Sequence, residues 1–219
     1  MSTLRIDVWS DVVCPWCYIG KRRLETALDR FEHAEEVEIH WHSFQLDPDH
    51  PKGARQPFYE TLAIKTGAPL AQRKAMTRQV TELAEAEGLT YDLKQAVCVN
   101  TIDAHRLSHL AAEHGLGDRM HERLLRAHLG EGEIVDDPDT LVRLGAEVGV
   151  PEDETRRMLD GDAYIDAVQA DFREARRYGA TGVPYFVLNR TYGLFGAQSA
   201  DTFLSALHTA HAGAAPANR

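Results

Sequence analysis

Two cysteines near the N-terminus, Cys14 and Cys17, enclose Pro15 and Trp16 where the sequence pattern changes. The apolar run at 4–9 is typical of a buried strand, and the residues after the second cysteine repeat apolar side chains with helical spacing. A strand that passes a C-x-x-C to the first turn of a helix places both cysteines beside unpaired N–H groups and the positive end of the helix dipole, which stabilise a thiolate. We therefore expect Cys14 to attack disulfides and Cys17, about one turn later, to resolve the mixed disulfide, with Pro15 and Trp16 in supporting roles.

A structural zinc site is the alternative use of such a cysteine pair. These sites take four protein ligands and often consist of two C-x-x-C pairs, and this chain has no second C-x-x-C. The third cysteine, Cys98, is expected to pack in the interior, with a third redox centre or an intermolecular link as its alternative role. A non-catalytic zinc-binding or chaperone module that holds an ion through Cys14, Cys17 and Cys98 stays an alternative, while our main interpretation contains no metal site.

The charge balance bears on the choice of partners. The chain of 219 residues has 24 Lys and Arg against 34 Asp and Glu, a formal net charge of −10. Nucleic acids and anionic membranes require a basic surface, so we expect neither as a partner. No basic segment followed by an apolar stretch marks a secretory signal, and no apolar run is long enough for a membrane span. We expect a cytoplasmic protein, present as a monomer or a homodimer.

Strand patterns occur only near the two ends of the chain. Predicted strands lie at 4–9, 37–44, 183–188 and 192–196. Helical patterns lie at 18–31, 76–87, 104–114, 138–148, 162–175 and 199–211. The first two strands and the helix between them predict a parallel βαβ unit, and the last two strands predict a hairpin that turns at Asn189-Arg190.

Neither end of the chain can bury its strands without the other. We therefore interpret residues 1–46 and 176–212 as one α/β domain, and 47–175 as an all-helical insertion into it. Residues 213–219 are expected to form a flexible tail. Within the insertion we expect Asp137 and Asp162 to act as helix N-caps.

Three segments together resemble the DsbA-like family of thioredoxin-fold proteins, and in particular its FrnE-type branch. They are 10–20 around the C-x-x-C, 100–107, and 181–187. The resemblance implies a thioredoxin fold with a large helical insertion and the activity of a dithiol–disulfide oxidoreductase or isomerase. The partners would be protein or peptide thiols and disulfides. No tightly bound cofactor is expected, and glutathione or a thioredoxin-type reductant would supply electrons.

The same resemblance assigns substrate binding to Val183, Pro184 and Tyr185. In a thioredoxin fold the proline at this position follows a cis peptide bond and lies across from the C-x-x-C. The Val183 backbone would then pair with an extended peptide. The apolar side chains of Trp16 and Tyr185 would contact the substrate.

Two positions differ from those of relatives. Thioredoxin and DsbA carry a buried acid six residues before the nucleophile, and here that residue is Val8. We expect Asp7 on the opposite face of the strand and Asp11 in an exposed turn, with Asp11, a water or the leaving substrate as proton acceptor. Trp16 stands where DsbA has a histidine that stabilises the thiolate, so we expect a less oxidising couple.

His105, in the second resembling segment, is expected to be a solvated or packing residue.

A second class of enzyme has the same topology. Glutathione-dependent isomerases that resemble 2-hydroxychromene-2-carboxylate isomerase, and kappa-class glutathione transferases, activate glutathione with a single serine- or cysteine-type residue. Such enzymes do not need a second cysteine, so Cys17 favours the dithiol chemistry. The leading interpretation is thus a cytoplasmic disulfide isomerase or reductase, and the glutathione-dependent enzyme is its alternative.

Overall fold

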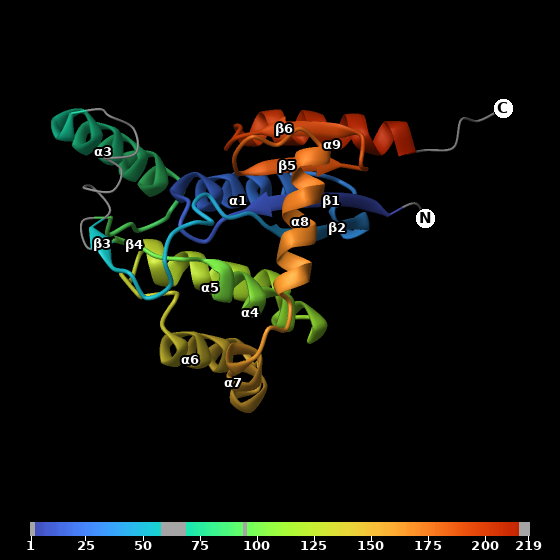
Figure 1. The fold of residues 1–219 in the computed structure, drawn as a ribbon. Helices are drawn as coiled ribbons and strands as arrows, with labels where there is room; N and C mark the ends of the chain where they lie inside the picture. Colours follow the sequence, from blue (N-terminus) through green and yellow to red (C-terminus); the bar gives the residue numbers. More distant parts are fainter. Residues whose placement is uncertain (1–2, 58–68, 94–95, 215–219) are drawn as a thin grey trace.

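One four-stranded mixed sheet organises the computed structural model, which describes residues 3–57, 69–93 and 96–214 (Figure 1). The strands are β1 (Leu4–Ser10), β2 (Val37–Ser43), β5 (Tyr185–Leu188) and β6 (Tyr192–Phe195), in the spatial order β2-β1-β5-β6. β1 and β2 run parallel, which confirms the predicted βαβ unit. β5 pairs antiparallel with both β1 and β6, so the two ends of the chain share one sheet.

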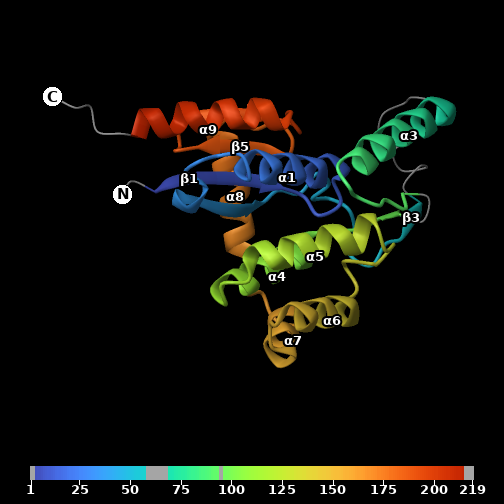
Figure 2. The same ribbon diagram turned by 180° about the vertical axis from the view of Figure 1, so that it is seen from behind.

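Helices cover both faces of this sheet. The helices α1 (Pro15–Leu28) and α9 (Ala200–Ala214) pack on one face, and α8 (Ile165–Arg177) crosses the other (Figures 1 and 2). Side chains alternate along β1, so Val8 joins the apolar core under α1 and α9. Trp9 points the other way, where its indole N–H donates to the Asp171 carbonyl of α8 at 2.9 Å.

The helices that precede α8 in the insertion lie on the β2 side of the sheet, except the first, which lies near the N-terminal end of α1 (Figures 1 and 2). These helices are α3 (Leu70–Ala86), α4 (Ile102–Glu113), α5 (Gly117–Leu129), α6 (Pro138–Val148) and α7 (Glu152–Asp160). Two-residue strands, β3 (Gln56–Pro57) and β4 (Val97–Cys98), pair as a short ribbon, and the 3-10 turn η1 (Ala34–Glu36) precedes β2. Apart from this ribbon, the described part of the insertion has the helical character that the sequence predicts.

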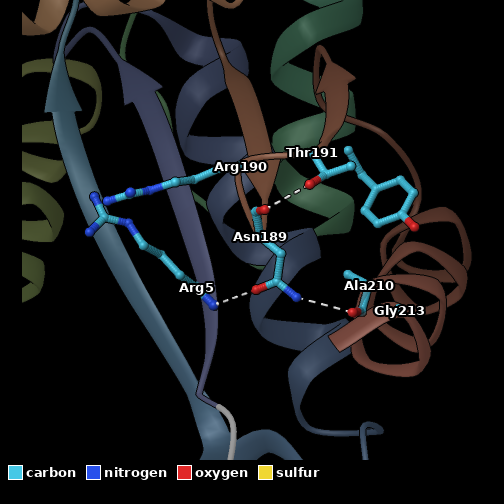
Figure 3. A pocket seen from close by; sticks show the side chains of 7 residues that line it. Arg5, Asn189, Arg190, Thr191, Ala210 and Gly213 are labelled. Carbon is cyan, nitrogen blue, oxygen red and sulfur yellow. Dashed lines mark hydrogen bonds between the residues drawn. The ribbon is translucent and has the colours of Figure 1, made fainter. Parts of the chain in front are cut away.

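The predicted turn at Asn189-Arg190 is confirmed, and its first residue also anchors the hairpin. Both residues have positive φ, 47° and 57°, as a tight hairpin turn of this kind requires. Figure 3 shows the Asn189 side chain accepting from the Arg5 backbone N–H at 3.0 Å and donating to the Ala210 carbonyl at 3.0 Å. One amide thereby joins β1, the hairpin and α9.

Of the two predicted N-caps, one is right and one is wrong. Asp137 accepts from the Thr140 N–H at 2.9 Å, and its helix ends at Gly149 with a φ of 113°. Asp162 does not cap α8: the N-cap is Tyr164, whose φ of 66° brings the chain into the helix. Asp162 contributes to the start of the helix only through its backbone carbonyl, which accepts a hydrogen bond from the Ile165 N–H.

Residues 213 and 214 belong to a helix and not to the predicted flexible tail. α9 continues through Gly213 to Ala214, because alanines and an apolar face against the sheet sustain it. Residues 215–219 of that prediction lie outside the described residues. No helix in the described ranges is long and apolar enough to cross a membrane.

The packing of α9 on the sheet yields a stability prediction. Phe203 is fully buried and lies edge-on to Phe186 of β5, with ring centroids 4.7 Å apart. Phe203→Ala should lower the free energy of unfolding by about 3–5 kcal/mol, because it opens a cavity under α9. Urea unfolding measures this loss, and Met76→Ala, at a site 59% exposed, should change it by less than about 0.5 kcal/mol.

Candidate active site

The two cysteines lie where β1 gives way to α1. Cys14 is the N-cap of α1 with extended backbone, and Pro15 is its first helical residue. The Cys14 N–H donates to the Asp11 carbonyl at 3.0 Å, which closes the turn between strand and helix. Both thiols are buried, so the C-x-x-C occupies the strand–helix junction that the sequence predicts.

The segment Val183-Pro184 crosses in front of these thiols. Its peptide bond is cis, as expected, and the Cys14 Sγ lies 3.7 Å from the Val183 carbonyl oxygen. Gly20 permits this approach, because a Cβ there would lie 3.2 Å from the side chains of both Pro184 and Phe186. Two motifs far apart in the sequence therefore meet at one site.

Cys17 is the deeper of the two thiols, with 1% of its surface exposed. Burial raises the pKa of Cys17 well above its usual value, and a hydrogen bond with Cys14 raises it further. The Ser10 hydroxyl and the Asp11 backbone oppose this shift only in part. Cys17 is thus a neutral thiol that hydrogen-bonds with Cys14, an arrangement that suits a resolving cysteine.

Asp11 does not lie in an exposed turn, so that expectation is wrong. Its carboxylate is fully buried and accepts from the Leu46 backbone N–H at 2.8 Å. Its other oxygen lies 3.2 Å from the Nε2 of His105, which is also buried. The chain leaving β2 and the helix α4 fold over this side chain, and a polar group enclosed in this way requires partners. Asp11 thus ties the active-site turn to the insertion.

His105 and His109 are four residues apart on α4, which is the H-x-x-x-H spacing of helical metal sites and a pair that sequence reasoning overlooked. The ring of His109 turns instead to Ser43 and Asp171, at 3.1 Å from an oxygen of each. Among the described residues two clusters could share a metal ion, and neither contains a cysteine or His105.

Asp7 faces away from the thiols, as predicted, and serves a different network. The two nitrogens of His42 lie 2.7 Å from Asp7 and 2.9 Å from Asp171. Burial opposes protonation of His42, but the hydrogen bonds to the two carboxylates outweigh it and raise its pKa to about 9. Arg5 also donates to Asp7, so this carboxylate is committed to ion pairs on the α8 face.

The two predicted substrate-contact side chains lie in different surroundings. Trp16 is exposed beside the buried thiols. The Tyr185 hydroxyl donates to the Tyr178 carbonyl at 3.0 Å, and its ring packs beside Trp9. The structure thus leaves the indole accessible and engages the phenol within the protein.

Tyr91 is a site residue that sequence reasoning missed. It is buried, and its hydroxyl donates to the Pro15 carbonyl at 2.7 Å. Its ring stacks on that of Tyr18, with centroids 6.3 Å apart. Burial is the largest cause that raises the pKa of the Tyr91 phenol, and the nearby thiols of Cys14 and Cys17 raise it further. No motif surrounds this residue, and only the folded chain brings it to the C-x-x-C.

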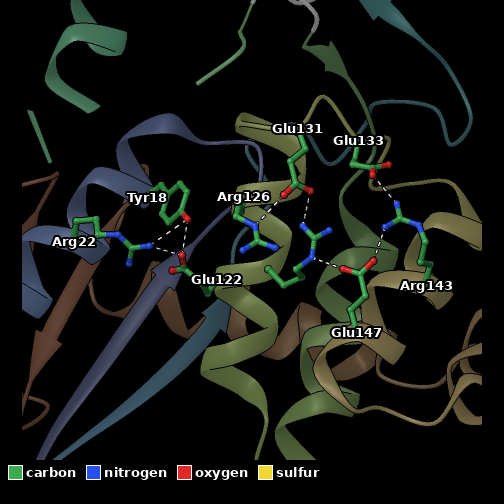
Figure 4. A network of polar contacts seen from close by, with 9 residues as sticks. Tyr18, Arg22, Glu122, Arg126, Glu131, Glu133, Arg143 and Glu147 are labelled. Carbon is green, nitrogen blue, oxygen red and sulfur yellow. Dashed lines mark hydrogen bonds and ion pairs between the residues drawn. The ribbon is translucent and has the colours of Figure 1, made fainter. Parts of the chain in front are cut away.

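A polar network continues from α1 into the insertion. The Tyr18 hydroxyl donates to Glu122 of α5 at 2.5 Å, and Arg22 pairs with the same carboxylate (Figure 4). Further ion pairs between arginines and glutamates extend through α5 to α6, as Figure 4 shows. Lys21, buried in α1, lies 3.1 Å from Asp118. These contacts fix the first helix of the site against the insertion.

Residues 5–208 match the DSBA-like thioredoxin domain, and the chain belongs to this family of thiol oxidoreductases with a thioredoxin fold. It is similar over its whole length to a probable DsbA oxidoreductase of Streptomyces coelicolor. That structure shares 40% identity and a TM-score of 0.94, with 99% of this chain and 93% of the other covered.

Two further relatives extend this comparison. The protein YwbO of Bacillus subtilis is 28% identical over 207 residues, which cover 94% of this chain and 96% of YwbO. The cytosolic disulfide reductase DsbM of Pseudomonas aeruginosa, solved with GSH, shares the fold at 23% identity and a TM-score of 0.64. The match covers 94% of this chain and 98% of DsbM.

The His42 network predicts a loss of stability in alkaline solution. The folded-state pKa of about 9 exceeds the unfolded value of about 6.5. The stabilisation is therefore complete below pH 6.5 and is lost as the pH rises through 9, by about 3 kcal/mol. Urea unfolding from pH 6 to pH 8.5 should show most of this decline in the wild type and not in His42→Gln, because the thiols of the unfolded chain ionise only above about pH 8.5. The exposed His114 provides the control, since His114→Gln should keep the wild-type profile.

The Tyr91 contact predicts a modest structural effect. Tyr91→Phe keeps the ring and removes the hydrogen bond to the Pro15 carbonyl, so the free energy of unfolding should fall by about 0.5–1.5 kcal/mol. Chemical denaturation measures this change. Tyr192→Phe, on the exposed strand β6, serves as the matched control, and equal effects of the two variants would contradict the prediction.

Proposed function

We propose that this protein is a thiol–disulfide oxidoreductase that reduces or isomerises disulfides in proteins or peptides with Cys14 and Cys17. The approach of the Cys14 Sγ to the Val183 carbonyl oxygen, at 3.7 Å, carries this proposal. It supports a role in which a nucleophilic sulfur acts directly beside a backbone segment that holds an extended substrate.

The reaction begins with the Cys14 thiolate, which attacks one sulfur of the substrate disulfide. A mixed disulfide forms, and the second substrate sulfur leaves as a thiolate. Cys17 then attacks the Cys14 sulfur, and its proton passes to the departing substrate thiolate. The substrate gains two electrons and the protein is left with a Cys14–Cys17 disulfide. In isomerisation, a substrate thiol attacks the mixed disulfide in place of Cys17.

A reductant must then restore the dithiol. Glutathione or a thioredoxin-type protein would supply the two electrons by the reverse exchange. The likeness in fold to DsbM, solved with GSH, supports glutathione as one such partner. A reductase of this kind requires a reducing compartment, so we place the protein in the cytoplasm.

The surface around the thiols supports a peptide substrate. Trp16, Leu46 and Phe195 are exposed apolar side chains, and each belongs to a segment in contact with the site. Leu46 bonds to Asp11 through its backbone, and Phe195 lies against the glycine before Val183. A hollow of about 620 Å³ extends from Leu46 to Thr181. Exposed apolar side chains on the segments of the site fit an unfolded protein as substrate.

Cysteine variants test this function with reduced glutathione and insulin. Cys14→Ser should lower the rate of insulin disulfide reduction at least about 100-fold, since it removes the nucleophile. Cys17→Ser should retain the first attack and accumulate a mixed disulfide, visible by mass spectrometry as an adduct on Cys14. Cys98→Ser is the control and should keep the wild-type rate.

The same variants separate the alternatives. Glutathione conjugation to an aromatic electrophile that persists in Cys17→Ser, without insulin reduction by the wild type, would replace our proposal with the isomerase or transferase function. Stoichiometric zinc lost on Cys98→Ser would replace it with the metal-binding module.

A further inference from the structure

A cluster of side chains that could hold a metal ion lies at the opposite end of α1 from the thiols. His33 and Glu36 belong to the connection between α1 and β2, and His211 belongs to the last turn of α9. α9 runs beside α1 (Figure 2). One ligand atom from each of the three lies within 4.8 Å of the others. Since α1 has 14 residues, the cluster is about 20 Å from the C-x-x-C.

The three side chains lie close enough together to share an ion. The Glu36 Oε1 lies 3.5 Å from the Nδ1 of His33, and its Oε2 lies 3.5 Å from the Nε2 of His211. Hydrogen bonds to nitrogen span about 2.7–3.2 Å. Two ligands bound at about 2.0 Å to a tetrahedral zinc ion are about 3.3 Å apart. Each oxygen of the Glu36 carboxylate therefore lies near one imidazole, at a separation close to that of two ligands on one ion.

A buried ring supports the two imidazoles. Phe31 meets His33 and His211 edge-on, with centroids 5.7 Å and 5.9 Å away. The two imidazoles stack on each other at 4.0 Å, so each must rotate about its Cβ–Cγ bond to direct a lone pair at a common point. Their side chains are 38% and 29% exposed, which leaves room for that rotation.

The other cluster with metal-binding residues lacks a free lone pair. In the group His42, Asp171 and Glu174, both nitrogens of His42 already lie within 2.9 Å of carboxylates. The His42 ring is protonated and held between two carboxylates, and a protonated ring does not bind a metal ion. The two clusters therefore differ in the chemistry available to an ion.

We propose that His33, Glu36 and His211 bind one divalent transition-metal ion of the zinc type, with solvent completing the coordination. Two imidazoles and a carboxylate are a ligand set that zinc accepts. The bound ion would tie the connection after α1 to the end of α9 and stabilise the folded chain. Both imidazoles must be neutral to bind, so the affinity falls in acid.

Calorimetric titration with zinc tests the site. The protein carries no purification tag, and as a thiol block its three cysteines are replaced by serine so that they cannot bind the ion. The wild type should bind one zinc ion, and His211→Gln and Glu36→Gln should each weaken binding at least tenfold. Glu174→Gln, in the other cluster, is the matched control and should bind as the wild type does.

Thermal unfolding gives a second measurement. Zinc should raise the melting temperature of the wild type and of Glu174→Gln, and leave that of the His33→Gln/His211→Gln double variant unchanged. Equal melting temperatures in EDTA show that the variants fold. Absence of saturable binding at millimolar zinc, or equal binding in the double variant, would overturn the proposal.

Insulin reduction by the double variant without the thiol block separates this proposal from the redox function. The rate should equal that of the wild type, because the cluster lies far from Cys14. The zinc-site proposal and the proposed disulfide chemistry can therefore be supported or refuted independently of each other.

Discussion

The antiparallel pairing of β1 with β5 is the constraint on which the site depends. Its register places Trp9 opposite Tyr185 and Ile6 opposite Leu188. β1 then ends at Ser10, shortly before Cys14, and β5 begins directly after Pro184. The strand pairing thereby brings Cys14 and the Val183-Pro184 segment together. A slip of one residue would turn every side chain of the strand to the other face and separate the two motifs.

Two faces of β1 perform different tasks as a consequence. The Val8 face is apolar and packs under α1 and α9. The Asp7 face holds charges that bind β2 and α8 through His42. Asp7 is therefore a carboxylate next to the position of the buried acid in the relatives, but it is engaged in ion pairs with Arg5 and His42. The chain carries its buried acid near the site at Asp11, on the turn rather than the strand.

Most features encoded by neighbouring residues could be predicted from the sequence. Among the features created by distant partners, only the cis Val183-Pro184 segment across from the C-x-x-C was predicted, and the family resemblance implied it. The C-x-x-C at a helix start, the hairpin turn at Asn189 and the cap at Asp137 follow from local chemistry, and the structure contains all three. The burial of Asp11 depends on α4 and on the chain after β2, and the Tyr91 contact depends on a loop of the insertion. Such contacts leave no periodicity or spacing in the sequence.

The separation of the two motifs along the chain has a consequence for synthesis. Cys14 and Val183 are 169 residues apart, and ribosomes add roughly 5–20 residues per second. The thiols therefore emerge on the order of ten seconds before the strand that covers them. During that interval the nascent chain carries an exposed cysteine pair without its partner segment. Until the last strands arrive, those thiols are open to oxidants and to other thiols.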